Sequence, residues 1–120
     1  MNDLGILYRD GIGVRQDDAK ACSWFRKAAV QNDPDAFLNL GEAYLQGHGV
    51  KQDYKAAEDW FLKAAEGGNS SAMYILGSMY ELGTGFEPDL QAAVSWYEKA
   101  AALNDKAAAE RLRQLNSGRS

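Results

Sequence analysis

Hydrophobic and polar positions along the chain repeat every 36 residues, the spacing that separates Leu4, Leu40 and Leu76. From these leucines three segments align without a gap: LGILYRDGIGVRQDDAKACSWFRKAA, LGEAYLQGHGVKQDYKAAEDWFLKAA and LGSMYELGTGFEPDLQAAVSWYEKAA. A period of this length is typical of proteins that stack one small structural unit several times. The pattern therefore predicts a repeat architecture with three copies.

Each copy predicts a first helix, most clearly the middle one. Asp33 can cap the free backbone N–H groups at the start of this helix, and Gly47 can end it in a left-handed conformation. Between them, apolar side chains recur at helical spacing at Ala36, Leu40 and Tyr44. The segment 33–47 is therefore expected to form a capped amphipathic helix.

A second helix is predicted from Asp53 through Glu66, after a GHGV turn. Its apolar face is expected to contain Ala57, Trp60, Phe61, Ala64 and Ala65. Equivalent capping residues recur in the other copies, at Asp17 and Asp89 for the second type of helix and at Asn69 and Asp105 for the first. In the third copy the turn reads Phe86-Glu87-Pro88, and we expect it to bend differently.

A glycine recurs inside each first helix, at Gly5, Gly41 and Gly77. Glycine in a helix costs about 1 kcal/mol relative to alanine, so a compensating contact is expected. We predict a close approach of the second helix, with the ring of Trp24, Trp60 or Trp96 near the respective glycine.

The repeated pattern L-G-x-x-Y-x-x-G-x-G-V-x-x-D-x-x-x-A-x-x-W-F/Y-x-K-A-A resembles the Sel-one-like repeat, a relative of the tetratricopeptide repeat. This resemblance covers the chain from Met1 to about Ala108. It implies an α/α solenoid that serves as an adaptor or assembly platform for other proteins, in signalling, protein quality control and bacterial envelope or host-interaction settings. As a rule it does not imply catalysis.

A single helical pair cannot bury an apolar stripe on both sides, so neighbouring pairs must stack. We expect an all-α, right-handed α/α superhelix that forms one domain over residues 1–116. Its repeats are expected at about 1–32, 33–68 and 69–104, followed by a capping helix at 105–116 and a flexible tail at 117–120. The first helix of the first copy should be short, because that copy lacks the capping residue of the later ones.

Composition excludes several classes of function. The 120 residues carry a formal net charge of −4, with a pI near 4.9 and no cationic run, which argues against nucleic-acid partners. The single Cys22 cannot form an internal disulfide. No run approaches the roughly 20 apolar residues of a membrane span, and no signal peptide is apparent. As written, the chain is expected in the cytoplasm, or in the periplasm or outside the cell if it is a fragment of a longer protein.

Candidate chemistry is sparse. His48 stands between two glycines, but it has no metal-ligand partners at suitable spacing, and we interpret it as a solvated turn residue. Cys22 is expected at a partly exposed, unreactive position, since its counterparts are Glu58 and Val94. No serine begins an S-x-x-K acylation motif. We therefore predict no enzyme activity, no cofactor and no metal.

Function is expected where the copies differ, on the first helices, which line the concave surface of such solenoids. The predicted groove residues are Arg9, Leu38, Asn39, Glu42, Leu45, Gln46, Tyr74, Ile75, Ser78, Glu81 and Leu82. Leu38, Leu45 and Tyr74 would anchor a partner protein or peptide. Alternatively, some of these apolar residues fill the seam between repeats.

Two further hypotheses remain open at this stage. The chain could be a cell-envelope component that binds peptidoglycan or polysaccharide, as some members of the resembling family suggest. It could also associate with itself through an N-terminal edge at which Leu4, Ile6 and Leu7 are poorly covered.

Overall fold

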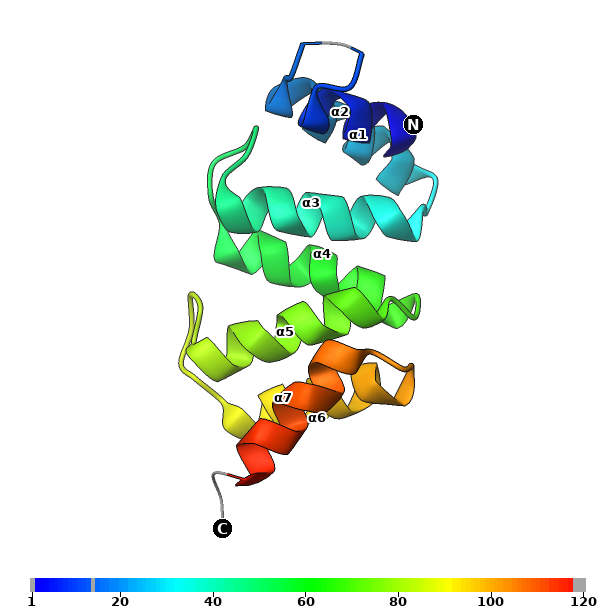
Figure 1. Ribbon diagram of the computed structural model, residues 1–120. Helices are drawn as coiled ribbons and strands as arrows, with labels where there is room; N and C mark the ends of the chain where they lie inside the picture. The colour runs from blue at the N-terminus through cyan, green and yellow to red at the C-terminus, as the bar shows by residue number, and fades with distance from the viewer. Residues whose placement is uncertain (1, 14, 118–120) are drawn as a thin grey trace. The chain divides into compact units, whose positions relative to one another are not determined.

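The computed structural model describes residues 2–13 and 15–117, and in these ranges it contains helices and turns without a strand. The helices are α1 (Asn2–Asp10), α2 (Asp18–Val30), α3 (Pro34–Gln46), α4 (Tyr54–Glu66), α5 (Ser70–Leu82), α6 (Leu90–Ala102) and α7 (Lys106–Ser117). They are shown in Figure 1. The predicted all-α class is confirmed.

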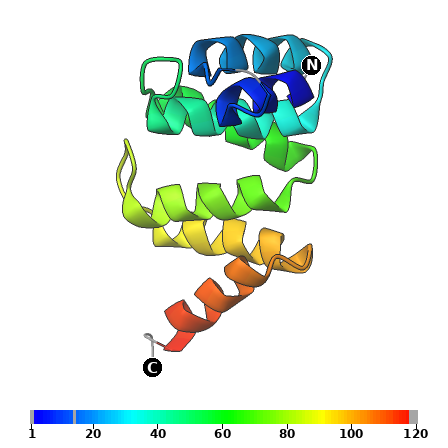
Figure 2. The same ribbon diagram turned by 45° about the horizontal axis from the view of Figure 1, so that its top comes forward.

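The chain forms two compact units, Met1–Ala64 and Ala65–Ser120, whose boundary lies within α4. In the first unit α2 packs against both α1 and α3, and in the second α6 packs against both α5 and α7. Figure 2 shows that the α1–α2 and α3–α4 turns lie at one end of the first unit and the α2–α3 connection at the other. Each unit therefore has the alternating helix order of a solenoid. That residues 1–116 act as one domain stays a prediction.

The predicted N-terminal caps are all confirmed, because each side-chain oxygen accepts a hydrogen bond from a backbone amide two or three residues later. The capping residues are Asp17, Asp33, Asp53, Asn69, Asp89 and Asp105. Each cap of this kind stabilises its helix by about 1 kcal/mol. Local chemistry therefore fixes where most of the helices begin.

The turn inside each helical pair is closed by one repeated backbone hydrogen bond. The amide of Asp53 donates to the carbonyl of Tyr44 at 2.9 Å, and Asp17 and Asp89 make the same bond in their copies at 2.8 Å. The third turn therefore keeps this closing bond in spite of its different sequence. Its difference lies in the side chains, where the ring of Phe86 packs on Tyr80 with 4.8 Å between centroids.

The helical glycines do allow a close approach, but the ring in contact with each glycine is not that of a tryptophan. A Cβ atom at Gly41 would lie 2.6 Å from two ring carbons of Phe61, and one at Gly77 would lie 2.6 Å from the ring of Tyr97. Gly5 meets the ring of Phe25 in the same way. The ring over each glycine thus belongs to the residue that follows the tryptophan.

The tryptophans lie instead at the edge of the core, because adjacent helical residues point about 100° apart. All three are partly buried, and each lies under the ammonium group of the lysine three residues later. The distances from Nζ to the ring centroid are 4.4 Å at Trp24, 5.0 Å at Trp60 and 4.5 Å at Trp96. Such cation–π contacts shield an indole that the core does not fully cover.

Three further predictions, about Cys22, the C-terminal tail and the first helix, can be compared with the structure. Cys22 is buried, with 1% of its surface exposed, so the predicted partial exposure was wrong. The capping helix α7 includes Ser117, so the tail does not begin there, and residues 118–120 lie outside the described residues. The first helix is indeed shorter than the others, with 9 residues in α1 against 13 in α3.

Gly41→Ala tests the contact between the glycine and the ring. At an exposed helical position this change would stabilise the protein by about 1 kcal/mol. Here the new methyl group would collide with Phe61, so we expect the free energy of unfolding to fall by about 1–3 kcal/mol. Urea unfolding followed by circular dichroism measures the difference.

The double variant Gly41→Ala, Phe61→Leu is the matched control, because leucine removes the ring that causes the collision. In the Phe61→Leu background the alanine should cost less than in the wild type. If Gly41→Ala raised the free energy of unfolding of the otherwise wild-type protein, that result would contradict the close approach of the two helices.

Candidate functional site

The predicted groove residues lie on the first helices α1, α3 and α5, and many of them gather around one pocket in each unit. Arg9, Asn39, Glu42 and Gln46 line a pocket of the first unit. Tyr74, Ser78, Glu81 and Leu82 line a pocket of the second. Leu38, Leu45 and Ile75 line neither of these pockets and are partly buried.

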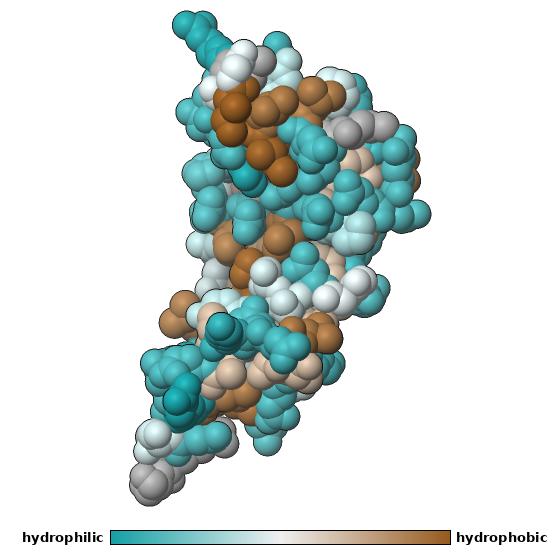
Figure 3. All heavy atoms as spheres, turned by 45° about the vertical axis from the view of Figure 1, so that its right-hand side comes forward, coloured by the Kyte–Doolittle hydropathy of each residue, from teal (hydrophilic) through white to brown (hydrophobic). Residues whose placement is uncertain are grey.

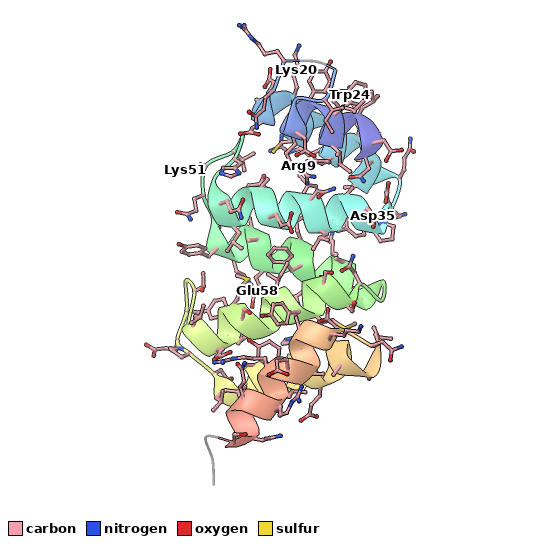
Figure 4. All side chains as sticks on the ribbon, viewed as in Figure 1. Arg9, Lys20, Trp24, Asp35, Lys51 and Glu58 are labelled. Atoms are coloured by element: carbon pink, nitrogen blue, oxygen red, sulfur yellow. The ribbon has the colours of Figure 1, made fainter. Side chains whose placement is uncertain are left out.

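The first pocket has a volume of about 40 Å³ and lies between α1, α2, α3 and the GHGV turn. A polar chain of side chains crosses it from α1 to α3. Nη1 of Arg9 donates to Oδ1 of Asn39 at 3.0 Å, and Nδ2 of Asn39 donates to Oδ1 of Asn2 at 2.9 Å. Figure 4 labels Arg9 at this place. Two of the predicted groove residues are thus already committed to contacts within the chain.

The GHGV turn forms one wall of this pocket through its backbone. The Cys22 thiol donates to the carbonyl oxygen of His48 at 3.2 Å, and any side chain at Gly49 would collide with the backbone of Asp18. His48 itself is exposed. Sequence reasoning missed Cys22, Asp18 and His48 as pocket residues, since their contact depends on how two repeats meet.

Glu42 contributes a partly buried carboxyl group to the first pocket. Partial burial raises the pKa of its carboxyl above the ordinary value, while the positive charge of Arg9 acts in the opposite direction. Within the described part of the chain, no hydrogen bond reaches the Glu42 carboxylate. Burial also raises the pKa of the Cys22 thiol, which argues against a reactive cysteine.

The second pocket is a wider cleft of about 340 Å³ between α5, α6 and α7. The Tyr97 hydroxyl donates to Oε1 of Glu81 at 2.8 Å, and Nε of Arg111 donates to the same oxygen at 3.0 Å. The other oxygen of Glu81 also pairs with Arg111. Ser78 Oγ lies 3.3 Å from the Tyr97 hydroxyl. Sequence reasoning missed Tyr97, Arg111 and Gln114 as residues of this cleft.

The surroundings of Glu81 and Tyr97 in the second cleft determine the protonation state of each side chain at neutral pH. The hydrogen bond from Arg111 is the main cause that lowers the pKa of Glu81 from its ordinary value of 4.5. Burial, with a contribution from Glu81, raises the pKa of Tyr97 to about 12. At neutral pH the cleft therefore contains a paired carboxylate and a neutral phenol.

Family comparison agrees with this arrangement of helices. The Sel1 repeat profile matches residues 1–33, 34–69 and 70–105. The chain belongs to the Sel1 repeat family. The resemblance that the sequence pattern indicated is therefore confirmed, and members of this family are generally noncatalytic modules for protein–protein interaction.

Solved structures of bacterial Sel1 repeat proteins share the fold. A Sel1 repeat protein from Oxalobacter formigenes is 40% identical, with a TM-score of 0.87 over 92% of this chain and 45% of the other. The protein c5321, a protective antigen present in uropathogenic Escherichia coli strains, is 36% identical, with a TM-score of 0.88 over 95% and 24%. This chain thus spans less than half the length of either protein.

Helicobacter pylori cysteine rich protein B is a further similar structure, 28% identical with a TM-score of 0.74. The match covers 81% of this chain and 74% of that one. No curated protein sequence matches the chain.

Two negative findings apply to the described residues. No group of three or more His, Cys, Asp and Glu side chains is placed there to hold a metal ion. Likewise, no helix among the described residues combines the length and the apolar character that a membrane crossing requires.

Equivalent positions of the Sel1 repeats make a polar contact in both units, with different residue types. Arg9 pairs with Asn39, and Glu81 pairs with Arg111, each across 30 residues of sequence and between successive first helices. Complementary polar residues at this separation were visible in the sequence. That regular spacing is the signal that could have shown these groove positions to be structural contacts.

Glu81→Gln tests the ion pair between α5 and α7. The folded-state pKa of Glu81 is lowered, so its stabilising effect is present above pH 4.5 and is lost as pH falls through the lowered value. At pH 7 we expect Glu81→Gln to reduce the free energy of unfolding by about 1 kcal/mol, allowing for solvent screening. Urea unfolding between pH 7 and pH 3 should show this deficit shrinking.

Glu110→Gln is the matched control, because Glu110 pairs with Arg113 on the exposed surface of α7. We expect no measurable change in stability from this variant. A deficit for Glu81→Gln that stays constant from pH 7 to pH 3 would show that the charge of Glu81 does not stabilise the fold.

Proposed function

We propose that this Sel1 repeat chain is a noncatalytic interaction module that binds a segment of a partner protein on its first-helix surfaces. The observation that carries the proposal is the second cleft, where the exposed Leu82 lies beside aromatic rings and a polar network. The general role of the family supports a protein as the partner.

Leu82 has the properties of an interface anchor. It is the last residue of α5 and 75% of its surface is exposed. Tyr74 and Tyr97, whose ring centroids are 5.5 Å apart, line the same cleft. An apolar centre with a polar rim is the usual composition of a protein interface.

Figure 3 shows that the apolar areas on the visible face are separated from one another by hydrophilic side chains. In the first unit, Leu4 is 40% exposed, whereas Ile6 packs against the core cluster of Ala21, Phe25 and Leu40. Small apolar areas of this kind suit contact with a peptide segment better than with a broad apolar surface.

The polar groups of the second cleft are unsuited to acid–base catalysis. A general acid or base works best with a pKa near the working pH. The pKa of Tyr97 is about 12, and that of Glu81 is below 4.5 and is held there by Arg111. These groups instead support a rigid surface on which a partner can bind.

Leu82→Ser is expected to reduce capture of the partner protein by at least about tenfold, because it removes the exposed anchor and leaves the buried core intact. Affinity purification of the tagged full chain from its source cells, with quantitative mass spectrometry, measures the captured protein. Leu103→Ser is the matched control, since Leu103 also lies at the C-terminal end of a helix, as the C-cap of α6, and is 48% exposed.

Equal capture by the wild type and both variants would show that the partner does not bind at Leu82. Co-sedimentation with purified peptidoglycan supplies a second arm. Glycan binding that Leu82→Ser does not weaken, together with no captured protein, would favour the envelope hypothesis over protein binding.

A further inference from the structure

Three donor groups at the first pocket, on Arg9, Asn39 and Cys22, are already used within the chain. Arg9 donates to Asn39, Asn39 donates to Asn2, and the thiol of Cys22 donates to the carbonyl of His48. Arg9 also forms an ion pair with Asp10 at 3.0 Å, which offsets its positive charge. These three residues therefore offer a ligand few free donors, whereas the side-chain amide of Gln46 can either donate or accept.

Acceptors of the same pocket are in surplus. The carboxylate of Glu42 accepts no hydrogen bond among the described residues, and two further residues with side-chain oxygens, Asp18 and Gln46, belong to the pocket lining. A partly buried carboxylate without a hydrogen-bond partner is unfavourable, since burial removes water that would otherwise solvate it. The pocket is thus suited to a ligand group that carries positive charge and donates several hydrogen bonds.

We propose that this pocket binds the ammonium group of a lysine side chain from the partner, with the Glu42 carboxylate as its ion-pair partner. The source of the lysine rests on the proposed function, whereas the preference for an ammonium group rests on the pocket alone. Asp18 and Gln46 would accept the remaining N–H groups. The methylene stem of the lysine would lie toward the pocket opening.

Chemistry favours an ammonium group over the other cations. A lysine ammonium is a compact point charge with three donors that can turn toward Glu42, whereas the planar guanidinium of arginine requires acceptors placed to match its fork of donors. Among the described residues no set of three metal-ligating side chains lies here, so a divalent cation would lack ligands. An anionic ligand would be repelled by Glu42 and Asp18.

The test uses n-butylammonium as a soluble equivalent of the lysine side chain, added to the whole 120-residue chain labelled with nitrogen-15. We expect saturable shifts of backbone amides on α3 around Glu42, with a Kd in the millimolar range. Glu42→Gln keeps the shape and removes the charge, and should weaken binding at least about tenfold, the loss of a partly buried ion pair. n-Butanol, which has the same stem without charge, should bind more weakly by a similar factor.

Glu98→Gln is the matched control, because it makes the same charge change at an exposed residue of α6 in the other unit. Its affinity for n-butylammonium should equal that of the wild type. Unchanged affinity in Glu42→Gln, equal affinity for n-butanol, or no saturable shift up to molar amine would overturn the proposal. The test is independent of capture at Leu82, so failure here leaves the proposed function standing, and the reverse also holds.

Discussion

The close approach of two helices at a glycine is the contact on which the rest of each repeat depends. At Gly41 the missing side chain makes room for the ring of Phe61, which is fully buried. Gly77 and Tyr97 repeat this arrangement in the second unit. A ring that packs directly on helical backbone fixes the distance between the two helices of a pair. The turn that joins the two helices is then closed by the same backbone hydrogen bond in each copy.

In the third copy the core ring also has a role in the cleft. Its equivalents are phenylalanines, whereas Tyr97 carries a hydroxyl that reaches Glu81 and Ser78. The same side chain thus fills the space over a glycine and orders the polar groups of the second cleft. A change in core packing at this position would also change the surface that we propose for the partner.

Sequence reasoning selected residues of the first helices as a binding surface, and the structure shows that they differ in whether they are paired within the chain. Arg9, Asn39 and Glu81 were expected to meet a partner, yet each is paired with a side chain on a neighbouring first helix. Glu42 and Leu82, from the same predicted set, keep their interacting groups available. The distinction depends on which side chains face each other across a helical seam, and a single helix pattern does not contain that information.

The sequence by itself determined the helices, their caps and the family, because these depend on residues within a few positions of one another and on a strict repeat. Asp53 and Gly47 act through their own backbone, so their roles could be predicted locally. Only the tertiary structure decided that Phe61 rather than Trp60 covers Gly41, and that Cys22 is buried against His48. Those outcomes depend on the relative rotation of packed helices, which is set by the fit of many side chains together.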